Sequence, residues 1–143
     1  MAVTGKNPYD QYKQTQINTA NQGKLIVMLY DGAIKFLNIA IENMQPKTYD
    51  IVNNNILKAQ DIITELMLSL NMNEGGQISQ NLMSLYIYFK KRMIEANIQK
   101  NTEILKEIVK LMLELRDAWE QISAKESKND NYRESKGSFS IEG

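Results

Sequence analysis

The chain has 143 residues, of which 43% are hydrophobic and 24% are charged, values typical of one globular domain with its own core. It has no cysteine and no histidine. This excludes disulfides, thiol chemistry and the side chain that most often serves as general base or transition-metal ligand. Its 17 basic residues balance its 17 acidic residues, whereas nucleic-acid-binding proteins usually carry a basic excess.

Breakers of regular structure are scarce, with only two prolines and seven glycines. That is too few for many short strands joined by tight turns, so helices are favoured. The N-terminus lacks the apolar segment of a secretory signal, and no apolar run is long enough to span a membrane. We therefore expect a protein of the cytosol, without stable membrane insertion and without a nucleic-acid partner.

Residues 1–23 are expected to form an N-terminal arm or a short cap helix. Residues 1–8 are typical of a flexible leader, and the polar stretch that follows carries the isolated apolar residues Tyr9, Tyr12 and Ile17. This spacing suits a short helix or an arm laid on a surface. The residues leave open whether the arm has a function. Asn21 is suited to cap the helix that follows, because its side chain can accept from an exposed N–H of the first turn.

The first helical stripe runs from Leu25 to Met44 and passes through Asp31-Gly32, a dipeptide typical of turns. Glycine costs a helix about 1 kcal/mol relative to alanine. Burial of one large apolar side chain contributes about 1.5–3 kcal/mol, and this stripe has many. We therefore expect a continuous helix, with Gly32 allowing close approach of a neighbouring backbone.

Three further helices are expected, at about residues 50–71, at about residues 78–97, and from an N-cap at Asn101 to about Ser123. Their apolar residues recur three and four positions apart. The stripes are Val52, Ile56, Ala59, Ile63, Leu66, Met67 and Leu70; then Ile78, Leu82, Leu85, Tyr86, Phe89, Met93 and Ala96; then Leu105, Ile108, Met112, Leu115, Trp119 and Ile122.

The predicted fold is all-α, an antiparallel four-helix bundle over residues 24–123. The connections at residues 44–50, 71–77 and 98–101 are short, which places consecutive helices side by side in opposite directions. Residues 124–143 are polar, mixed in charge and unpatterned, so we expect a flexible, mostly disordered tail.

Catalytic patterns are missing from the sequence. A di-iron site in a helical bundle needs Glu-x-x-His pairs, which a chain without histidine cannot supply. Glu103 and Glu107 alternate with Lys106 and Lys110, the pattern of a solvated face. The Gly75-Gly76 pair lacks the lysine and the preceding strand of a phosphate-binding loop. We expect no enzyme activity, no metal and no cofactor.

The predicted helices carry more apolar residues than one buried face each requires. Outside the main stripes lie Ile26, Val27, Met28, Ile34, Ile39, Leu57, Ile62, Leu68, Ile104, Leu111 and Leu113. There are also eight methionines, whose flexible thioethers suit a surface that repacks around a partner. The sequence thus predicts a non-enzymatic bundle that binds other helices, covered by a partner, by its own arms or by a second copy.

A family resemblance adds to this inference. Within NPYDQYKQTQINTANQGKLIVMLYDGAIKFLNIA, the chain resembles the N-terminal signature of FliS, the flagellin-specific export chaperones of bacterial flagella. The matching positions are Ile17, Thr19, Ala20, Met28, Leu29, Tyr30, Asp31 and Gly32, and KAQDIITEL at 58–66, LN at 70–71, LY at 85–86, AN at 96–97 and RDAW at 116–119 are similar to later signatures. The resemblance covers about residues 7–123. Asn21-Gln22 departs from it, because the family usually has Ser/Thr-Pro there.

The resemblance implies two partners, the C-terminal segment of flagellin and a protein of the flagellar type III export gate. The chaperone would hold that segment in the cytosol, prevent its premature polymerisation and deliver it to the gate. By position, the residues Tyr9, Tyr12 and Ile17 would belong to an arm that covers the apolar surface when flagellin is absent. Such a protein would be a monomer or a weak dimer.

Four further residues are expected to take part in partner binding: Tyr30, Asp31, Ile63 and Met67. We expect Ile63→Asp or Met67→Asp to weaken client binding, whereas a core role would instead unfold the protein. Gly32 is expected to serve contact with the second helix rather than with a client. The rival hypothesis is a bundle that buries the same faces by self-association and has no secretion client.

Overall fold

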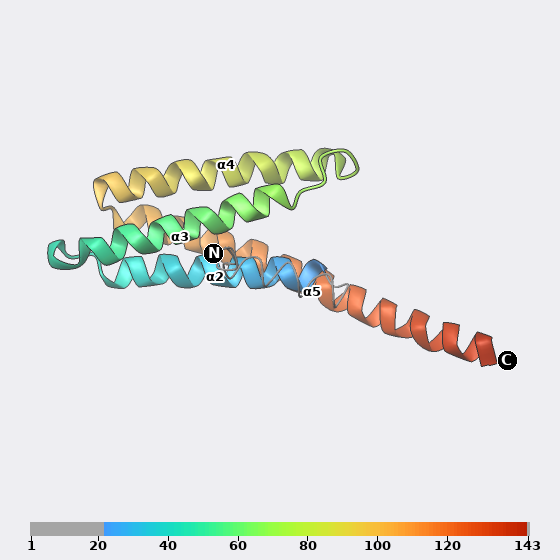
Figure 1. Cartoon of the computed structure of the whole chain (residues 1–143). Coiled ribbons are helices and arrows are strands. Elements are labelled where there is room, and N and C mark those ends of the chain that lie inside the picture. The colour runs from blue at the N-terminus through green and yellow to red at the C-terminus, as the bar shows by residue number, and fades with distance from the viewer. Residues whose placement is uncertain (1–21, 143) are drawn as a thin grey trace, which may run out of the picture. The chain divides into compact units, whose positions relative to one another are not determined.

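The computed structural model describes residues 22–142, with side chains through residue 125. Its elements are α2 (Gln22–Glu42), the short 3-10 helix η2 (Pro46–Thr48), α3 (Tyr49–Leu68), α4 (Gly76–Gln99) and α5 (Thr102–Glu142) (Figure 1). There is no strand among these residues, so the all-α prediction is confirmed. No helix in the described range has the length and apolar character needed to cross a membrane.

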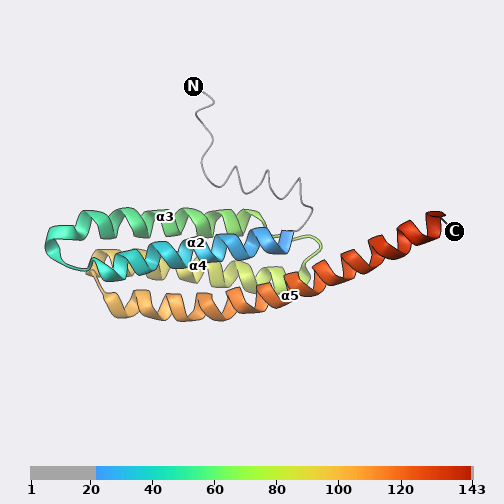
Figure 2. The same cartoon turned by 90° about the horizontal axis from the view of Figure 1, so that it is seen from below.

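The described residues fall into two compact units. One comprises residues 28–114 and contains part of each long helix; the other comprises residues 22–27 and 115–142. Within residues 28–114, the long helices form the predicted antiparallel four-helix bundle (Figures 1 and 2). The short connections explain this topology, because helices joined by a few residues pack side by side in opposite directions.

Cross-helix contacts fix which helices are neighbours in the bundle. The Lys58 ammonium lies 5.4 Å from the ring centre of Phe36, which joins α3 to α2. The Lys90 ammonium donates to the Thr64 hydroxyl at 2.8 Å, which joins α4 to α3. The Tyr88 hydroxyl donates to the Glu107 carboxylate at 3.1 Å, which joins α4 to α5.

The core of the bundle follows the predicted stripes. Its largest fully buried side chains are Tyr30, Leu37, Ile56, Ile62, Ile63, Leu66, Tyr86, Phe89, Met93, Leu105, Ile108 and Met112. Two predicted stripe residues differ, because Ile78 is 71% exposed at the start of α4 and Ile122 is 46% exposed on α5. Gly32 also differs from its expectation. The nearest atom to a Cβ placed there is the terminal methyl of Ile62 on α3, at 3.1 Å, and not a backbone atom.

One polar pair lies inside this apolar core. The hydroxyl groups of Tyr30 on α2 and Tyr86 on α4 are hydrogen-bonded at 2.8 Å, and their ring centres are 6.4 Å apart. Burial raises the pKa of the Tyr86 phenol, and the hydrogen bond with Tyr30 lowers it in part. A buried hydrogen bond has directional requirements that apolar contacts lack, so this pair favours one alignment of α2 against α4.

The α4–α5 connection is held by side chains at one end of the bundle. Asn101 accepts from the backbone N–H groups of Glu103 and Ile104 at 2.9 and 3.3 Å, which confirms the predicted N-cap. Lys100 has a left-handed backbone, with φ of 51°. Its ammonium donates to the Asn97 carbonyl at 2.8 Å and lies 5.2 Å from the ring centre of Tyr49.

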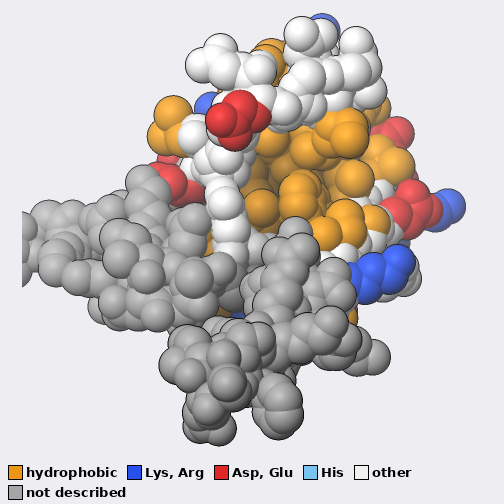
Figure 3. Space-filling view, turned by 90° about the vertical axis from the view of Figure 1, so that its right-hand side faces the viewer, with side chains coloured by type: hydrophobic (Ala, Val, Ile, Leu, Met, Phe, Trp, Pro, Cys, Tyr) orange, Lys and Arg blue, Asp and Glu red, His pale blue; other side chains and the backbone are white. Residues whose placement is uncertain are grey.

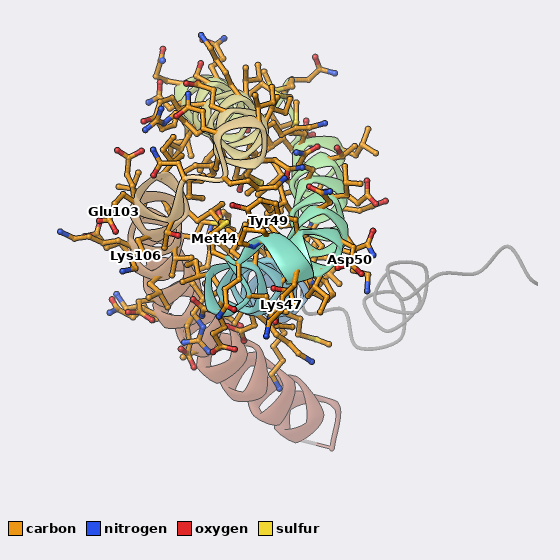
Figure 4. All side chains as sticks on the ribbon, turned by 90° about the vertical axis from the view of Figure 1, so that its left-hand side faces the viewer. Met44, Lys47, Tyr49, Asp50, Glu103 and Lys106 are labelled. Carbon is orange, nitrogen blue, oxygen red and sulfur yellow. The ribbon has the colours of Figure 1, made fainter. Side chains whose placement is uncertain are left out.

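The same end also carries the α2–α3 connection. In Figure 4, which looks onto it, Met44 and Tyr49 lie toward the space between the helices, whereas Glu103 and Lys106 lie on the outer side of α5. Glu103 and Lys106 form an ion pair at 3.5 Å, and both side chains are more than half exposed. The outer side of α5 at this end is therefore polar, as its alternating charges predicted.

The other compact unit contains a close helix–helix contact. A Cβ placed at Gly23 on α2 would lie 3.0 Å from the Cβ of Ser123 and 3.2 Å from its Cα on α5. Glycine avoids this crowding, because a Cβ at position 23 would press against both the side chain and the backbone of Ser123. Ser123, predicted as the approximate end of the last helix, is a buried residue within α5.

The last helix is longer than predicted. α5 continues from Ser123 to Glu142. The stretch at 124–142 has no proline and only one glycine, Gly137, and it contains several lysine and glutamate residues. These residues have high helix propensity, so the lack of an apolar stripe did not mark a helix end. The flexibility of residues 124–143 stays a prediction.

Candidate partner-binding surface

The described helices leave large apolar side chains exposed, as the surplus in the sequence predicted. These are Met28, Leu57, Leu68, Met72, Ile78, Ile87, Tyr88, Ile94, Ile98, Leu113 and Ile122. Four of them, Met28, Leu57, Leu68 and Leu113, are among the surplus residues named from the sequence. Four others named there, Ile26, Ile34, Ile62 and Ile104, are buried. Exposed apolar residues indicate an interaction surface where they form a contiguous patch.

On α3 and α4, five of these residues gather on adjoining outer stripes. Leu57 and Leu68 are eleven residues apart, so they lie on one side of α3, three turns from each other. On α4, Ile87, Ile94 and Ile98 are separated by seven and four residues, which also places them on one side. These five residues are 51%, 71%, 53%, 47% and 78% exposed, respectively. We refer to them together as the outer α3–α4 surface.

The hydrogen bond between Thr64 and Lys90 shows that the two stripes flank the same seam. Thr64 is four residues before Leu68, so the two side chains are neighbours on α3. Lys90 is likewise three residues after Ile87 and four residues before Ile94. Since Lys90 donates to Thr64, the side of α3 with the leucines and the side of α4 with the isoleucines meet along one line.

The opposite side of α4 is covered by charged and polar contacts. Arg92 forms ion pairs with Glu95 at 3.2 Å and with Glu107 at 3.3 Å. Tyr88 adds its hydrogen bond to Glu107. An ion pair therefore crosses the exterior of the α4–α5 seam, whereas exposed leucine and isoleucine side chains flank the exterior of the α3–α4 seam. This asymmetry favours the α3–α4 side as a docking surface.

Apolar side chains also gather at the end of the molecule where α3 turns into α4. Figure 3 shows them in a patch below that turn, with charged side chains at its margin. Met72, in the turn, is 43% exposed, and Ile78, just after it, is 71% exposed. The turn itself is closed by Asn71, whose side-chain oxygen accepts from the N–H groups of Asn73 and Glu74 at 3.2 and 3.0 Å.

The residues predicted to bind partners have different surroundings. Tyr30 and Ile63 are fully buried in the core of the bundle. A partner would reach them only if the bundle opened, so their role in partner binding stays a prediction. Asp31 is exposed on α2 and Met67 is half-buried on α3, and both are accessible in part. The full burial of Ile63 favours unfolding as the result of Ile63→Asp.

Residues 1–21 of the predicted arm lie outside the described residues, whereas Gln22 and Gly23 belong to α2. The expected role of Tyr9, Tyr12 and Ile17 therefore stays a prediction. The exposed side of α4 was not predicted from the sequence, because only one apolar stripe was expected on this helix. A second stripe at helical spacing, formed by Ile87, Ile94 and Ile98, is present in the sequence and could have indicated this side.

No group of three or more acidic side chains in the described part of the chain is placed to hold a metal ion.

Comparison with known proteins decides the family. A family model described as "Flagellar protein FliS" matches residues 5–126. The chain belongs to the FliS family. It is 37% identical, over 87% of its length and 92% of the relative's, to the protein named flagellar secretion chaperone FliS in Bacillus subtilis (strain 168).

More distant relatives agree with this membership. The flagellar secretion chaperone FliSB of Pseudomonas aeruginosa is 34% identical over 85% of this chain and 98% of its own length. The flagellar secretion chaperone FliS of Escherichia coli (strain K12) is 30% identical over 84% of this chain and 90% of its own length. FliS is a family of chaperones and not of enzymes, in agreement with the non-enzymatic role inferred from the sequence.

Proposed function

We propose that this chain is a cytosolic flagellar export chaperone whose client is the C-terminal segment of flagellin. It would prevent premature polymerisation of that segment and deliver it to the flagellar type III export gate. Membership of the FliS family supports the chaperone role. The observation that carries client binding is the apolar surface that the bundle leaves exposed, above all the outer α3–α4 surface.

The size of this surface suits a client that folds as it binds. Ordering a disordered segment costs about 2–5 kcal/mol or more of the gross interaction energy. At about 25 cal/mol per Å², roughly 100–200 Å² of buried apolar surface offsets that cost. A few half-exposed aliphatic side chains supply an area of this order. An amphipathic client segment would therefore lay its apolar side on these residues.

The N-terminal arm has a related role in this proposal. Residues Tyr9, Tyr12 and Ile17 would cover apolar surface while the client is absent and would leave it when the client binds. The released arm would then form part of the surface that docks on the export gate. Amide hydrogen exchange, measured with and without the flagellin segment, tests whether the client replaces the arm on the apolar surface. Arm amides should lose protection as amides under the client gain it.

Calorimetric titration of the full chain with the C-terminal segment of flagellin tests the main proposal. We expect one-to-one binding with little dependence on salt, because apolar contacts are screened far less than charge contacts. The matched control is the same segment with serine at its apolar helical positions, which should not bind. A stable dimer that is indifferent to the segment would instead support the rival, a self-associating bundle without a client.

A substitution on α3, beside Leu68 of the outer α3–α4 surface, tests whether the client contacts this part of the helix. Met67 is half-buried, so Met67→Asp should weaken client binding while the protein keeps its helical circular dichroism spectrum. Ile63→Asp, at a fully buried position, should unfold the bundle and serves as the contrasting variant. If folded Met67→Asp binds the segment as tightly as the wild type does, this part of α3 does not contact the client.

A further inference from the structure

We propose that Lys90, in the seam between α3 and α4, sets the register of a bound helix by pairing with a carboxylate on the apolar side of that helix. This inference rests on the proposed function, because it takes the outer α3–α4 surface as the place where a client helix lies. It adds the chemistry of the occupant, an amphipathic helix whose apolar stripe contains one aspartate or glutamate. The observation behind it is a half-buried cation that has no anionic partner.

The Lys90 ammonium has only a neutral partner among the described residues. It is half-buried and donates to the Thr64 hydroxyl at 2.8 Å. That hydroxyl directs its own proton to the Gln60 carbonyl at 3.2 Å, so it serves Lys90 as an acceptor. No acidic side chain of the described range forms an ion pair with Lys90. An ammonium has three donors, so two of them are left for water or for a binding partner.

Exposed apolar side chains lie on both sides of this ammonium along the seam. Ile87 lies three residues before Lys90 and Ile94 lies four residues after it, so the three share one side of α4. On α3, Leu68 lies four residues after Thr64. A helix that covers these apolar residues therefore also covers Lys90 and displaces water from its ammonium.

Loss of that water is unfavourable unless the incoming helix replaces it. Burial of a charge is costly when no partner compensates for it, and the Thr64 hydroxyl satisfies only one donor. A carboxylate supplies both an acceptor and the opposite charge, and hydrogen bonds between charged groups are roughly twice as strong as those between neutral groups. A helix with a carboxylate opposite Lys90 should therefore bind more tightly than one with a neutral side chain there.

The alignment of α3 with α4 determines where the carboxylate lies relative to the apolar contacts. Lys90 bonds to Thr64 and Lys100 bonds to Asn53, so the antiparallel helices are aligned at two points. Distances along the bundle can therefore be counted from the Lys90 position on both helices, with a rise of about 1.5 Å per residue.

Counted in this way, the exposed apolar residues form two groups around the ammonium. Toward the α3–α4 turn, Ile87 and Leu68 lie about 5 and 6 Å away. In the opposite direction, Ile94 lies about 6 Å away, and Leu57 and Ile98 lie about 10 and 12 Å away.

These distances predict a sequence pattern for the bound helix. They correspond to about three or four residues on one side of the carboxylate, and to about four and seven residues on the other side. Positions at these spacings share one side of a helix. The occupant should therefore have a regular apolar stripe in which one inner position is acidic. The acidic residue fixes the register, because any shift along the seam removes it from Lys90.

Two designed peptides test this preference with the full chain by isothermal titration calorimetry. Both are amphipathic helices with leucine about seven and four residues before a central position and about three residues after it. One peptide has glutamate at the central position and the other has glutamine. The wild type should bind the glutamate peptide about tenfold or more tightly than the glutamine peptide. In Lys90→Met, the difference should fall below about twofold.

Three variants separate this role from a merely structural one. Lys91→Met removes an exposed cation one residue later and is the matched control. It should alter the preference by less than about threefold, because exposed ion pairs contribute little. Lys90→Arg keeps the charge and should keep the preference. Circular dichroism should show an unchanged helical spectrum for all three variants, including Lys90→Met.

Equal binding of the two peptides by the wild type would overturn the inference, as would a preference that persists in Lys90→Met. Absence of binding by both peptides up to about 1 mM would also overturn it, and would mean that a different segment covers this surface. The flagellin segment is titrated separately. Its failure to bind would therefore count against the proposed client and not against the role of Lys90.

Discussion

The two sides of α4 carry similar apolar side chains in opposite surroundings. Phe89 and Met93 are fully buried, whereas Ile87 and Ile94 are 53% and 47% exposed. The hydrophobicity of a residue therefore does not decide its role in this helix. Its angle around the helix axis does, because only the inner side meets three other helices. We expect the inner side to determine stability and the outer side to determine association.

The largest effect should come from a matched pair of truncations on α4. Phe89→Ala removes a fully buried ring and should lower the free energy of unfolding by about 3–5 kcal/mol. Ile94→Ala, five residues later on the exposed side, should change it by no more than about 0.5 kcal/mol. Urea denaturation at low protein concentration measures both. Similar losses for the two variants would mean that the sides of α4 are not distinct.

A second comparison concerns the polar pair within the inner side. Tyr30→Phe removes the hydrogen bond to the buried Tyr86 hydroxyl and should cost about 1–3 kcal/mol. Tyr88→Phe, at a 40% exposed position of the same helix, should cost less, because water can replace the bond that its hydroxyl makes. If Tyr30→Phe is as mild as Tyr88→Phe, the inner polar pair contributes little to stability.

The pH dependence of stability gives an independent measure of this pair. Burial raises the pKa of the Tyr86 phenol, so the neutral phenol is favoured in the folded chain. Its contribution is complete below the unfolded pKa of about 10 and is lost as pH rises through the higher folded pKa. Tyr86→Phe should therefore show a shallower decline of stability above pH 10. An unchanged decline would contradict the inferred cause of the shift.

The inner side of the bundle could largely be predicted from the sequence, because burial repeats with the period of the helix. The continuous helix through Asp31-Gly32 and the N-cap at Asn101 followed from simple energies and local hydrogen bonding. The exposure of apolar residues outside the main stripes was harder to predict. Ile34 and Leu57 both lie outside the main stripes, yet Ile34 is buried and Leu57 is exposed. Only the placement of neighbouring helices separates them.

The sequence predicted that the bundle has a partner-binding surface, but it did not predict where on the bundle that surface lies. Surplus apolar residues indicated that some surface would need a cover, but they did not indicate which seam. That depends on Arg92 and Glu107, which make the α4–α5 seam polar. It depends also on Lys90, which joins Thr64 between the exposed stripes. Such pairings join residues far apart in the chain, and helical periodicity contains no information about them.

The smallest change in stability is expected at Gly32, a half-buried residue at the edge of the inner side of α2. Alanine there should add about 1 kcal/mol of helix propensity. Its Cβ would lie 3.1 Å from the terminal methyl of Ile62, so part of the gain is lost as that methyl moves. We expect Gly32→Ala to stabilise the protein by less than about 1 kcal/mol in urea denaturation. Ile62→Val removes the methyl, so it should cost less in the Gly32→Ala background than in the wild type. Equal costs in the two backgrounds would show that Ile62 does not restrict this position.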